Sequence, residues 1–460
     1  MNEKKDVFET MPVPKALATL AVPTIISQLI TMIYNLADTF FIGRTNDPYK
    51  VAACSLAFVL FFIMNALANL FGIGGGTLIS RLLGINDKEN AKRVCSFSFY
   101  GTIAVAGLYC LCTLMFMEPL LRLLGASDNT IGYASQYTFW VIVIGGIPST
   151  LSMTMAHLLR SEGYAKQASI GLSIGGVLNI VLDPLFMFVI LAPGQEVTGA
   201  AVATMLSNVC ALIYFCVAFY KLRNKTVLSV SLKNVRPANR HIRSVFAVGL
   251  PSALGTLLAC LSNTVINKLS SGYGDIPVAS MGIVKKIDML PMNVGMGLCQ
   301  GMMPLVAYNY SAKNYKRMKQ AANSARTAGI CFAAICIVVF QLFAGSIVTM
   351  FINEPETIKL GISFLRIACI AVPFTLINVQ MSYTFQAIGK GPQSLLLSSC
   401  RQGLINIPLL FLMNVVFGMY GVIWTQTIAD GITLIISFML YRQLDKEINK
   451  KISVQEAGKL

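Results

Sequence analysis

The chain has 460 residues, of which 55% are hydrophobic and only 12% are charged, and its mean hydropathy is +0.67. A soluble domain carries about 25% charged residues, so this composition excludes an ordinary soluble protein and indicates a polytopic membrane protein. The formal net charge of +16 does not indicate nucleic-acid binding, because the basic residues fall in short loops between apolar stretches.

About 20 consecutive apolar residues are enough to cross a bilayer as a helix. On this measure the sequence predicts an all-α integral membrane protein with twelve transmembrane helices. In chain order, the predicted helices cover residues 13–43, 51–83, 93–117, 130–158, 165–191, 198–220, 244–270, 277–309, 325–352, 361–388, 394–417 and 419–441. No cleaved signal peptide is expected before the first of them. The 12 cysteines lie mostly in apolar stretches and are not expected to form a disulfide framework.

The loops between the predicted helices differ strongly in charge. Lysine and arginine concentrate in the loops that would share one side of the membrane with both termini, and few lie on the other side. Because cytoplasmic loops carry an excess of these residues, we expect a multi-pass cell-membrane protein with both termini in the cytoplasm. The most basic loop, residues 221–243, contains no acidic residue. We expect it to be a solvated linker that lies against anionic headgroups.

This basic loop also divides an internal duplication. A shift of about 227 residues brings Pro23 close to Pro251 and Asn179 onto Asn406, together with other landmarks. Six helices per half let both halves enter the membrane in the same sense, so we expect parallel repeats. The predicted domains are an N-lobe at 1–220, the linker at 221–243, a C-lobe at 244–441 and a cytoplasmic tail at 442–460.

Three polar residues of the N-lobe are predicted to lie at a similar depth. Asp38 is five residues from the end of the first helix, Asp183 is eight from the end of the fifth, and Thr204 is six from the start of the sixth. At 1.5 Å per residue they lie roughly 8–12 Å below the outer surface, and Asn179 shares a helix face with Asp183. Two carboxylates that meet in a low dielectric cannot both stay charged cheaply, so one must hold a proton, bind a cation, or do both in turn. The alternative is a static hydrogen-bonded cluster that holds three helices together.

Three further residues are expected to support this cluster. Pro23 is predicted to kink the first helix, and Pro184 frees a backbone carbonyl close to Asp183. Asn35 lies near the far end of the first helix, three residues before Asp38. A kink close to a titrating site is a place where bending could be coupled to ion binding.

Other polar residues inside the predicted helices are candidates for a substrate cavity, namely Asn208, Asn263, Asp288 and Asp430. Lys285 precedes Asp288 by three residues, so a buried ion pair is the competing interpretation for that carboxylate. Asp430 has no obvious partner in the sequence. The plentiful Met and Phe residues would suit an adaptable apolar cavity, and lipid-facing helices explain them equally well.

No sequence motif supplies another source of energy or chemistry. The chain has no GxxxxGK[ST] phosphate loop, no HExxH, no Cys/His metal spacing and no G-x-S-x-G. We therefore expect a protein that is not an enzyme and that needs no cofactor, and active transport would have to draw on an ion gradient.

Six segments carry a family resemblance. They are the stretch from Pro23 that ends in YNLADTFFIG at 34–43, GTLISRLLG at 76–84, RSEG at 160–163, LNIVLDP at 178–184, GAAVAT at 199–204 and PLVAYN at 304–309. Together they resemble the multidrug and toxic compound extrusion (MATE) family, in its bacterial DinF-like and MepA-like branch. The resemblance extends over nearly the whole chain and follows the order of the family's motifs.

The resemblance implies twelve helices in two six-helix lobes that form a V, and export of amphipathic, often cationic drugs against entry of H+ or Na+. It also implies a cation site inside the N-lobe. The residues that match this site are Asp38, Asn179, Asp183 and Thr204, the first three being the ones that would hold Na+. The expected partners are small-molecule drugs or organic cations and the lipid bilayer, with no nucleic acid, and the chain is expected to act as a monomer.

Two other functions remain open at this point. A lipid-linked oligosaccharide flippase of related fold would need an arginine-rich central cavity, and Arg326, Arg366 and Arg401 are widely scattered. A membrane sensor or receptor would usually carry a soluble signalling domain, for which no loop is long enough. The sequence does not distinguish H+ from Na+, because carboxylates with Asn and Thr oxygens suit either ion.

Overall fold

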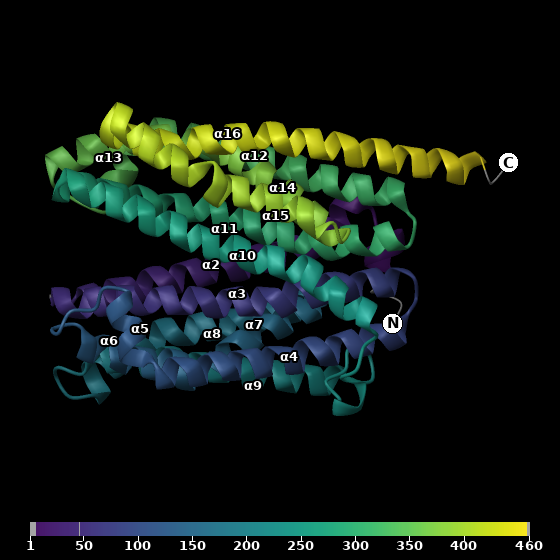
Figure 1. The fold of residues 1–460 in the computed structure, drawn as a ribbon, viewed down its shortest axis with the longest axis horizontal. Coiled ribbons are helices and arrows are strands. Elements are labelled where there is room, and N and C mark those ends of the chain that lie inside the picture. Colours follow the sequence, from purple (N-terminus) through teal and green to yellow (C-terminus); the bar gives the residue numbers. More distant parts are fainter. Residues whose placement is uncertain (1–5, 46, 458–460) are drawn as a thin grey trace. The chain divides into compact units, whose positions relative to one another are not determined.

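The computed structural model describes residues 6–45 and 47–457, and within these ranges the chain is helical without any strand. In each half the long helices run roughly side by side (Figure 1). Contacts divide the chain into two compact units. Unit 1 contains Ile26–Thr256, and unit 2 contains Asp6–Ile25 together with the chain from Leu257 onward. The predicted lobe boundaries at 220 and 244 differ from this division, because two long helices contribute to both units.

Helix α2 (Val13–Gly43) begins in unit 2 and ends in unit 1, and α10 (Asn239–Ser270) begins in unit 1 and ends in unit 2. The other elements of unit 1 are α3 (Pro48–Gly84), α4 (Lys88–Met115), α5 (Met117–Leu123), α6 (Ile131–Thr138), η2 (Phe139–Ile144), α7 (Gly146–Ser161), α8 (Ala165–Leu185), η3 (Phe186–Ile190), α9 (Glu196–Leu222) and η4 (Leu232–Asn234).

The remaining elements of unit 2 are η1 (Asp6–Thr10), η5 (Ser271–Tyr273), α11 (Asp275–Ser311), α12 (Tyr315–Thr349), α13 (Pro355–Ala368), η6 (Cys369–Ala371), α14 (Val372–Ala387), α15 (Gly391–Ser399), η7 (Cys400–Leu404) and α16 (Asn406–Ala457). Short π-helical or 3-10 segments therefore interrupt several of the long helices in both units. Such segments are common where a helix bends.

The predicted set of twelve spans matches the helices of the described chain. Nine stretches are long and apolar enough to cross a membrane by themselves, and α6 with η2 and α7 form a tenth that bends by 48°. Helix α11 is the eleventh, and charged residues in its first half, including Lys285 and Asp288, explain why composition alone does not mark it. The twelfth arises because Gly391–Ala457 contains two spans.

These last two spans are separated at Gly418, whose φ of 58° and ψ of −141° break the helix inside α16. Glycine adopts a positive φ at little cost, so it suits a sharp change of direction. Figure 1 draws α16 as two arms joined by a tight turn. The second arm continues to Ala457, so most of the predicted tail at 442–460 extends the last helix.

The two halves repeat the same backbone in detail. Asn86 and Lys313 each adopt a φ of 59°, and they lie at equivalent places in the predicted duplication. The next residue in each half, Asp87 or Asn314, accepts a hydrogen bond through its side chain from a backbone N–H in the first turn of the following helix. Both helices therefore start with the same side-chain cap.

Close helix packing is repeated as well. In unit 1 a Cβ added to Gly74 of α3 would lie 2.4 Å from the Val245 carbonyl oxygen and 3.1 Å from Gly249 Cα of α10. In unit 2 a Cβ added to Gly301 of α11 would lie 2.4 Å from Ala21 Cα of α2. Small residues let helix backbones approach this closely inside a membrane, and each unit uses them to hold the first half of a shared helix.

The basic linker is more ordered than the sequence suggested. The Glu162 carboxylate accepts hydrogen bonds from the Thr226 hydroxyl and, at 3.1 Å, from the Val227 backbone N–H. The Tyr100 hydroxyl donates to the Val230 carbonyl at 2.9 Å, and Leu228 is 5% exposed. The expectation of a purely solvated linker is therefore wrong for residues 226–230, because polar side chains of α4 and of the turn after α7 bind them.

Candidate functional site

The predicted polar residues of α8 and α9 meet in the interior of unit 1. The Asn179 amide nitrogen donates to Asp183 Oδ1 at 3.0 Å and to Thr204 Oγ1 at 3.1 Å. Asn179 and Asp183 are four residues apart, which places them on one face of α8. Asp183 is fully buried and Asn179 is 2% exposed. The structure thus brings together three of the four residues expected at a cation site.

Asp38 joins this group from α2. A Cβ added to Gly176 of α8 would lie 2.9 Å from Ile30 and 3.4 Å from Tyr34, so α2 passes close to α8. Ile30, Tyr34 and Asp38 follow one another at four-residue spacing and therefore share a face of α2. The Asp38 and Asp183 carboxylates are close enough for their charges to interact. The two carboxylates of the predicted pair thus belong to one cluster.

Three buried oxygen atoms of this cluster accept no hydrogen bond from the described residues, namely Asp38 Oδ1, Asn179 Oδ1 and Asp183 Oδ2. A buried acceptor without a donor costs about 1–3 kcal/mol, and more when it is charged. A proton on a carboxylate would relieve this cost, and so would a hard cation such as Na+, which prefers oxygen ligands. The donor set therefore fits either ion as transported cargo.

Two tyrosines and one cysteine near the carboxylates were missed by the sequence analysis. The phenol groups of Tyr34 and Tyr137 lie within reach of the charges of both Asp38 and Asp183, and the Cys54 thiol lies within reach of Asp38. Tyr34 could have been found from its spacing to Asp38 on α2. Tyr137 and Cys54 could not, because they come from α6 and α3 and only the tertiary fold brings them close.

The supporting residues have different positions. Pro23 lies inside α2, shortly before the chain passes from unit 2 to unit 1. Pro184 lies near the end of α8, where the helix changes to the π-helical η3. Asn35 is half-buried, and its backbone carbonyl accepts from the Thr39 hydroxyl at 2.9 Å. No printed contact among the described residues ties the Asn35 side chain to the carboxylates, and its supporting role remains a prediction.

Asp430 in unit 2 has partners that the sequence did not reveal. It is fully buried, and its Oδ2 accepts from the Thr375 hydroxyl and, at 2.9 Å, from the Gln426 amide. Its backbone carbonyl accepts from Asn378 at 2.9 Å. The charge of Arg401 also reaches this carboxylate. The interpretation that Asp430 faces no partner is therefore wrong, because α14 and a neighbouring turn of α16 supply donors.

The other candidates for a substrate cavity are not joined to Asp430 by hydrogen bonds among the described residues. The Lys285 ammonium donates to Asn267 Oδ1 at 2.8 Å and does not pair with Asp288, so the interpretation of these two residues as an ion pair is wrong. Asn263 is exposed and donates to the Ala259 carbonyl of its own helix at 3.0 Å. Asn208 is half-buried on α9. A substrate role for these residues remains a prediction.

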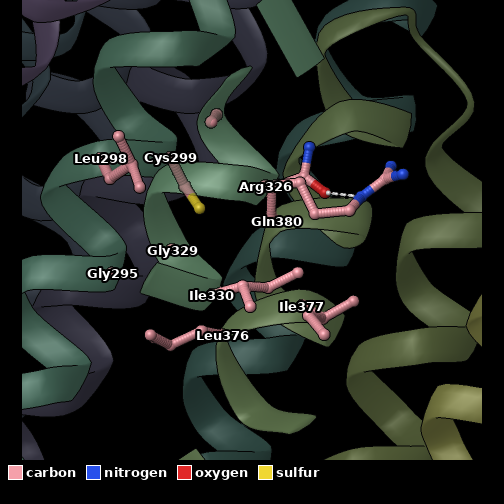
Figure 2. A pocket seen from close by; sticks show the side chains of 10 residues that line it. Gly295, Leu298, Cys299, Arg326, Gly329, Ile330, Leu376, Ile377 and Gln380 are labelled. Carbon is pink, nitrogen blue, oxygen red and sulfur yellow. Dashed lines mark hydrogen bonds between the residues drawn. The ribbon is translucent and has the colours of Figure 1, made fainter. Parts of the chain in front are cut away.

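A small pocket in unit 2 lies between α11, α12 and α14 (Figure 2). Its charged side chain is basic, whereas those of the cluster in unit 1 are acidic. Its lining is mostly apolar, and its polar side chains are Arg326 and Gln380, which are joined by a hydrogen bond of 3.2 Å from Arg326 Nε to Gln380 Oε1. The Arg326 guanidinium also lies 4.2 Å from the centre of the Tyr441 ring. No acidic side chain of the described chain lines this pocket, so its chemistry does not suit a cation.

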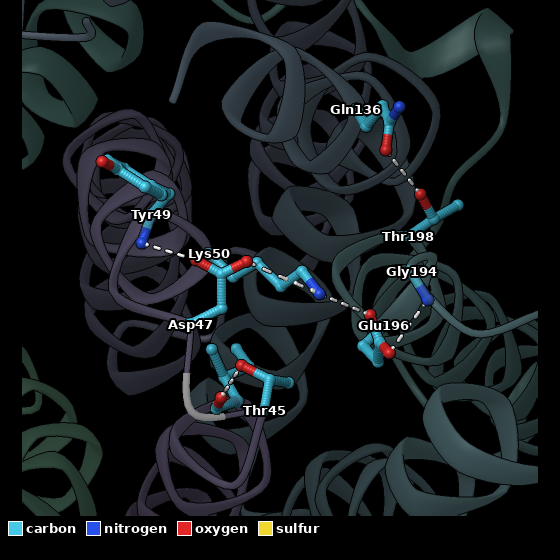
Figure 3. A network of polar contacts seen from close by, with 9 residues as sticks. Thr45, Asp47, Tyr49, Lys50, Gln136, Gly194, Glu196 and Thr198 are labelled. Atoms are coloured by element: carbon cyan, nitrogen blue, oxygen red, sulfur yellow. Dashed lines mark hydrogen bonds and ion pairs between the residues drawn. The ribbon is translucent and has the colours of Figure 1, made fainter. Parts of the chain in front are cut away.

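An ion-pair network connects the start of α3 with the start of α9 in unit 1 (Figure 3). The Lys50 ammonium lies 2.9 Å from Glu196 Oε2 and 3.7 Å from Asp47 Oδ2, and Lys50 is 8% exposed. The Gly194 backbone N–H donates to the other Glu196 oxygen at 3.0 Å. The network joins the start of α3 to the start of α9, and it lies two helical turns before Thr204 on α9. It therefore fixes the helix that carries one cluster residue.

Comparisons with known proteins agree with this arrangement. The MatE family model matches residues 23–185 and 251–412, one match in each half of the duplication. The multidrug export protein MepA of Staphylococcus aureus (strain MSSA476) is 33% identical over 440 residues, which cover 95% of this chain and 96% of MepA. MepA of Staphylococcus saprophyticus is 32% identical over 439 residues, with the same shares covered.

Solved structures give the same result. A MATE structure described as the straight conformation aligns with a TM-score of 0.90 and 25% identity, over 98% of this chain and 99% of that one. A multidrug resistance MATE transporter of the MOP superfamily in an outward-facing conformation aligns with a TM-score of 0.89 and 25% identity, over 95% and 97% of the two chains. With the twofold family match and 33% identity to MepA, these alignments show that the chain belongs to the MatE family and is a membrane transporter, not an enzyme.

Proposed function

We propose that this protein exports amphipathic, often cationic drugs in exchange for H+ or Na+, by alternating access. Its relatives at 32–33% identity are named multidrug export proteins, and this supports drug efflux over oligosaccharide flipping or signalling. The proposal includes a monomer in the cell membrane with both termini in the cytoplasm, which the distribution of basic loops supports.

One observation carries the coupling part of this proposal. Asp38, Asn179 and Asp183 each leave a buried oxygen without a donor in the same cluster. No lysine or arginine among the described residues exerts its positive charge on Asp38 or Asp183. The cluster therefore has a negative charge without internal compensation whenever its carboxylates ionise, and a cation from solution would neutralise it.

The proposed cycle uses this charge. A cation binds between Asp38 and Asp183 and removes their mutual repulsion. The α2 helix then bends near Pro23, which already lacks one backbone hydrogen bond. Drug leaves outward, and the cation is released inward to restore the empty cluster. Two solved MATE structures are described as a straight and a bent conformation, which supports a fold with at least two forms.

Drug transport in proteoliposomes tests this function. A pH gradient and a Na+ gradient are imposed separately on wild type, Asp38→Asn and Asp128→Asn. Asp128 is a matched control, because its carboxylate is exposed in a loop and pairs with Arg122. We expect one of the two gradients to drive transport in wild type and Asp128→Asn, and neither to drive it in Asp38→Asn. Full transport by Asp38→Asn would contradict the proposal.

A further inference from the structure

Helix α2 belongs to both units, and the boundary lies just after its proline. Residues Asp6–Ile25 pack with unit 2, whereas Ile26 onward, including Asp38, packs with unit 1. Pro23 lies two residues before that boundary. A bend of α2 can only move one half relative to the other if the first half is held. The contacts that hold it therefore matter for coupling.

The segment before α2 is bound to unit 2 through its backbone. Arg317 Nε of α12 donates to the Phe8 carbonyl at 2.7 Å, and Arg317 Nη2 donates to the Val7 carbonyl at 3.0 Å. The Asn309 amide of α11 also donates to the Phe8 carbonyl, at 3.1 Å. Arg317 is 9% exposed and Asn309 is 1% exposed. A planar guanidinium that spans two carbonyls fixes position and orientation together.

Side chains add to this attachment. The Phe8 ring stacks on Tyr308 with 4.8 Å between ring centres, and Phe8 is 3% exposed. The Tyr308 hydroxyl donates to Glu9 Oε1 at 2.5 Å. Tyr308 and Asn309 are the last two residues of the PLVAYN segment. The end of that segment therefore binds η1.

Close packing continues this attachment along α2. A Cβ added to Gly301 would lie 2.4 Å from Ala21 Cα, and one added to Gly297 would lie 2.6 Å from Ile25 Cα. The first half of α2 thus lies backbone to backbone against α11 up to the unit boundary. Beyond it, Gly176 of α8 receives Ile30 and Tyr34. Each half of α2 is held by a different unit, and Pro23 lies near the point of change.

Polar side chains also bind the backbone of the segment before α10 in the other half of the duplication, but among the described residues no guanidinium takes the place of Arg317 there. Asn90 occupies the place that corresponds to Arg317, and it donates to Asp87 within the start of its own helix, at 2.7 Å. The attachment made by a guanidinium on two carbonyls is thus the one that precedes α2, the helix that carries Asp38.

We infer that Arg317, Tyr308 and Asn309 form an anchor that keeps η1 and the first half of α2 fixed on unit 2 throughout the transport cycle, so that cation binding at Asp38 acts on unit 2 through α2. The inference rests on the proposed coupling at Asp38. The anchor stays bound because its release would leave a buried guanidinium without acceptors. Arg317, Tyr308 and Asn309 are positioning residues, which act through α2 and touch neither drug nor ion.

The test compares Arg317→Ala with Lys316→Ala. Lys316 is the adjacent residue, and its side chain is 70% exposed and pairs with Glu456 at the surface. Drug efflux under the driving gradient is measured in proteoliposomes. The rate is divided by the number of drug-binding sites, so that a variant with less folded protein is not mistaken for a slower transporter. We expect the maximal efflux rate of Arg317→Ala to fall about tenfold, as loss of two charge-assisted hydrogen bonds allows. Drug affinity and cation binding should stay within about twofold of wild type, and Lys316→Ala should match wild type throughout.

Two further variants keep the result decisive. Arg317→Lys retains the charge without the planar fork, so we expect partial rescue. Deletion of residues 2–10 removes the bound segment, and adding Arg317→Ala to the deletion should then cause little further loss. Wild-type efflux per binding site in Arg317→Ala, or a parallel loss of drug and cation binding, would overturn the anchor. Wild-type efflux in Asp38→Asn would instead overturn the coupling site, so the two failures are distinguishable.

Discussion

The two units each bury a carboxylate completely, but they surround it with different charges. Asp183 in unit 1 lies within reach of the charge of a second carboxylate, Asp38, and no basic residue of the described chain exerts its charge on Asp183. Asp430 in unit 2 is reached by the positive charge of Arg401 and has two side-chain donors on one oxygen. Asp288 shares the same arginine. Unit 2 therefore places a positive charge within reach of its buried acids, whereas the described residues of unit 1 place none near Asp38 and Asp183.

This contrast arose on one backbone. In both units a residue with a positive φ, Asn86 or Lys313, is followed by a residue whose side chain caps the next helix. Both also hold the first half of a shared helix against a glycine, Gly74 or Gly301. The duplication thus preserved turns and close packing while the buried polar residues diverged. The repeated positions shape the fold in both halves, and the proposed coupling uses positions that differ between them.

The largest expected effect comes from comparing substitutions of the two buried acids, Asp183 and Asp430. Asp183→Asn should lower gradient-driven drug efflux about 100-fold, because it removes a charge that only the transported cation neutralises. Asp430→Asn should lower it far less, since a neutral amide at that place still accepts from Thr375. Proteoliposome efflux measured side by side checks this. Equal losses in the two variants would contradict the contrast drawn here.

The repeated glycine contacts give the next effect. Gly301→Leu should destabilise the protein by about 3 kcal/mol, because its side chain would enter the space occupied by the α2 backbone. Gly74→Leu should have a similar effect through α10. Gly282 of α11 has open space around a built Cβ, so Gly282→Ala is the control and should be neutral or slightly stabilising. Thermal unfolding of the purified protein in detergent measures all three.

The ion pair at the end of unit 1 predicts a smaller loss. Lys50→Met should cost about 2 kcal/mol, because the Glu196 carboxylate, only 18% exposed in its side chain, would lose its cation. Lys92→Met removes a pair with Glu89 whose side chains are 39% and 70% exposed, and it should cost about 0.5 kcal/mol or less. A Lys92 variant that melts as early as the Lys50 variant would contradict the assignment.

The two helix caps give the smallest effect and differ in pH dependence. Burial opposes ionisation of Asp87, but hydrogen bonds from the side chain and backbone of Asn90 lower its pKa below the ordinary value overall. A lowered pKa in the folded state stabilises the fold above the unfolded-state pKa, and this stabilisation is lost as pH falls through the folded value. Asp87→Ala should lower the free energy of unfolding by about 1 kcal/mol near neutral pH and by less in acid. Asn314→Ala should lower it by a similar amount at both pH values, because an amide does not titrate.

Much of the fold could be predicted from the sequence because membrane spans are set by length and apolarity. The first helix has the predicted bounds, Val13–Gly43, and the grouping of Asn179 with Asp183 follows from their spacing on one helix. Thr204 joined them through depth counted along adjacent helices. These inferences needed only periodicity and the thickness of the bilayer.

The features that could not be predicted depend on tertiary contacts with the backbone or with distant helices. Thr375 as a partner of Asp430 requires knowing that α14 packs on α16. The anchor of Arg317 uses the Phe8 carbonyl as acceptor, and a carbonyl carries no sequence signal. Glu162 likewise binds the backbone of the linker. The linker was predicted to be solvated from its charges alone, and a count of charges contains no information about such contacts.

The central claim is that Asp38 and Asp183 hold the cation that leaves when drug binds. Its most direct test is to add drug to purified transporter in lipid nanodiscs and record release of H+ with a pH dye or of 22Na+ by filtration. We expect wild type to release one of these ions on drug addition and the Asp38→Asn, Asp183→Asn double variant to release neither. Undiminished drug-triggered ion release from a folded double variant would contradict the account.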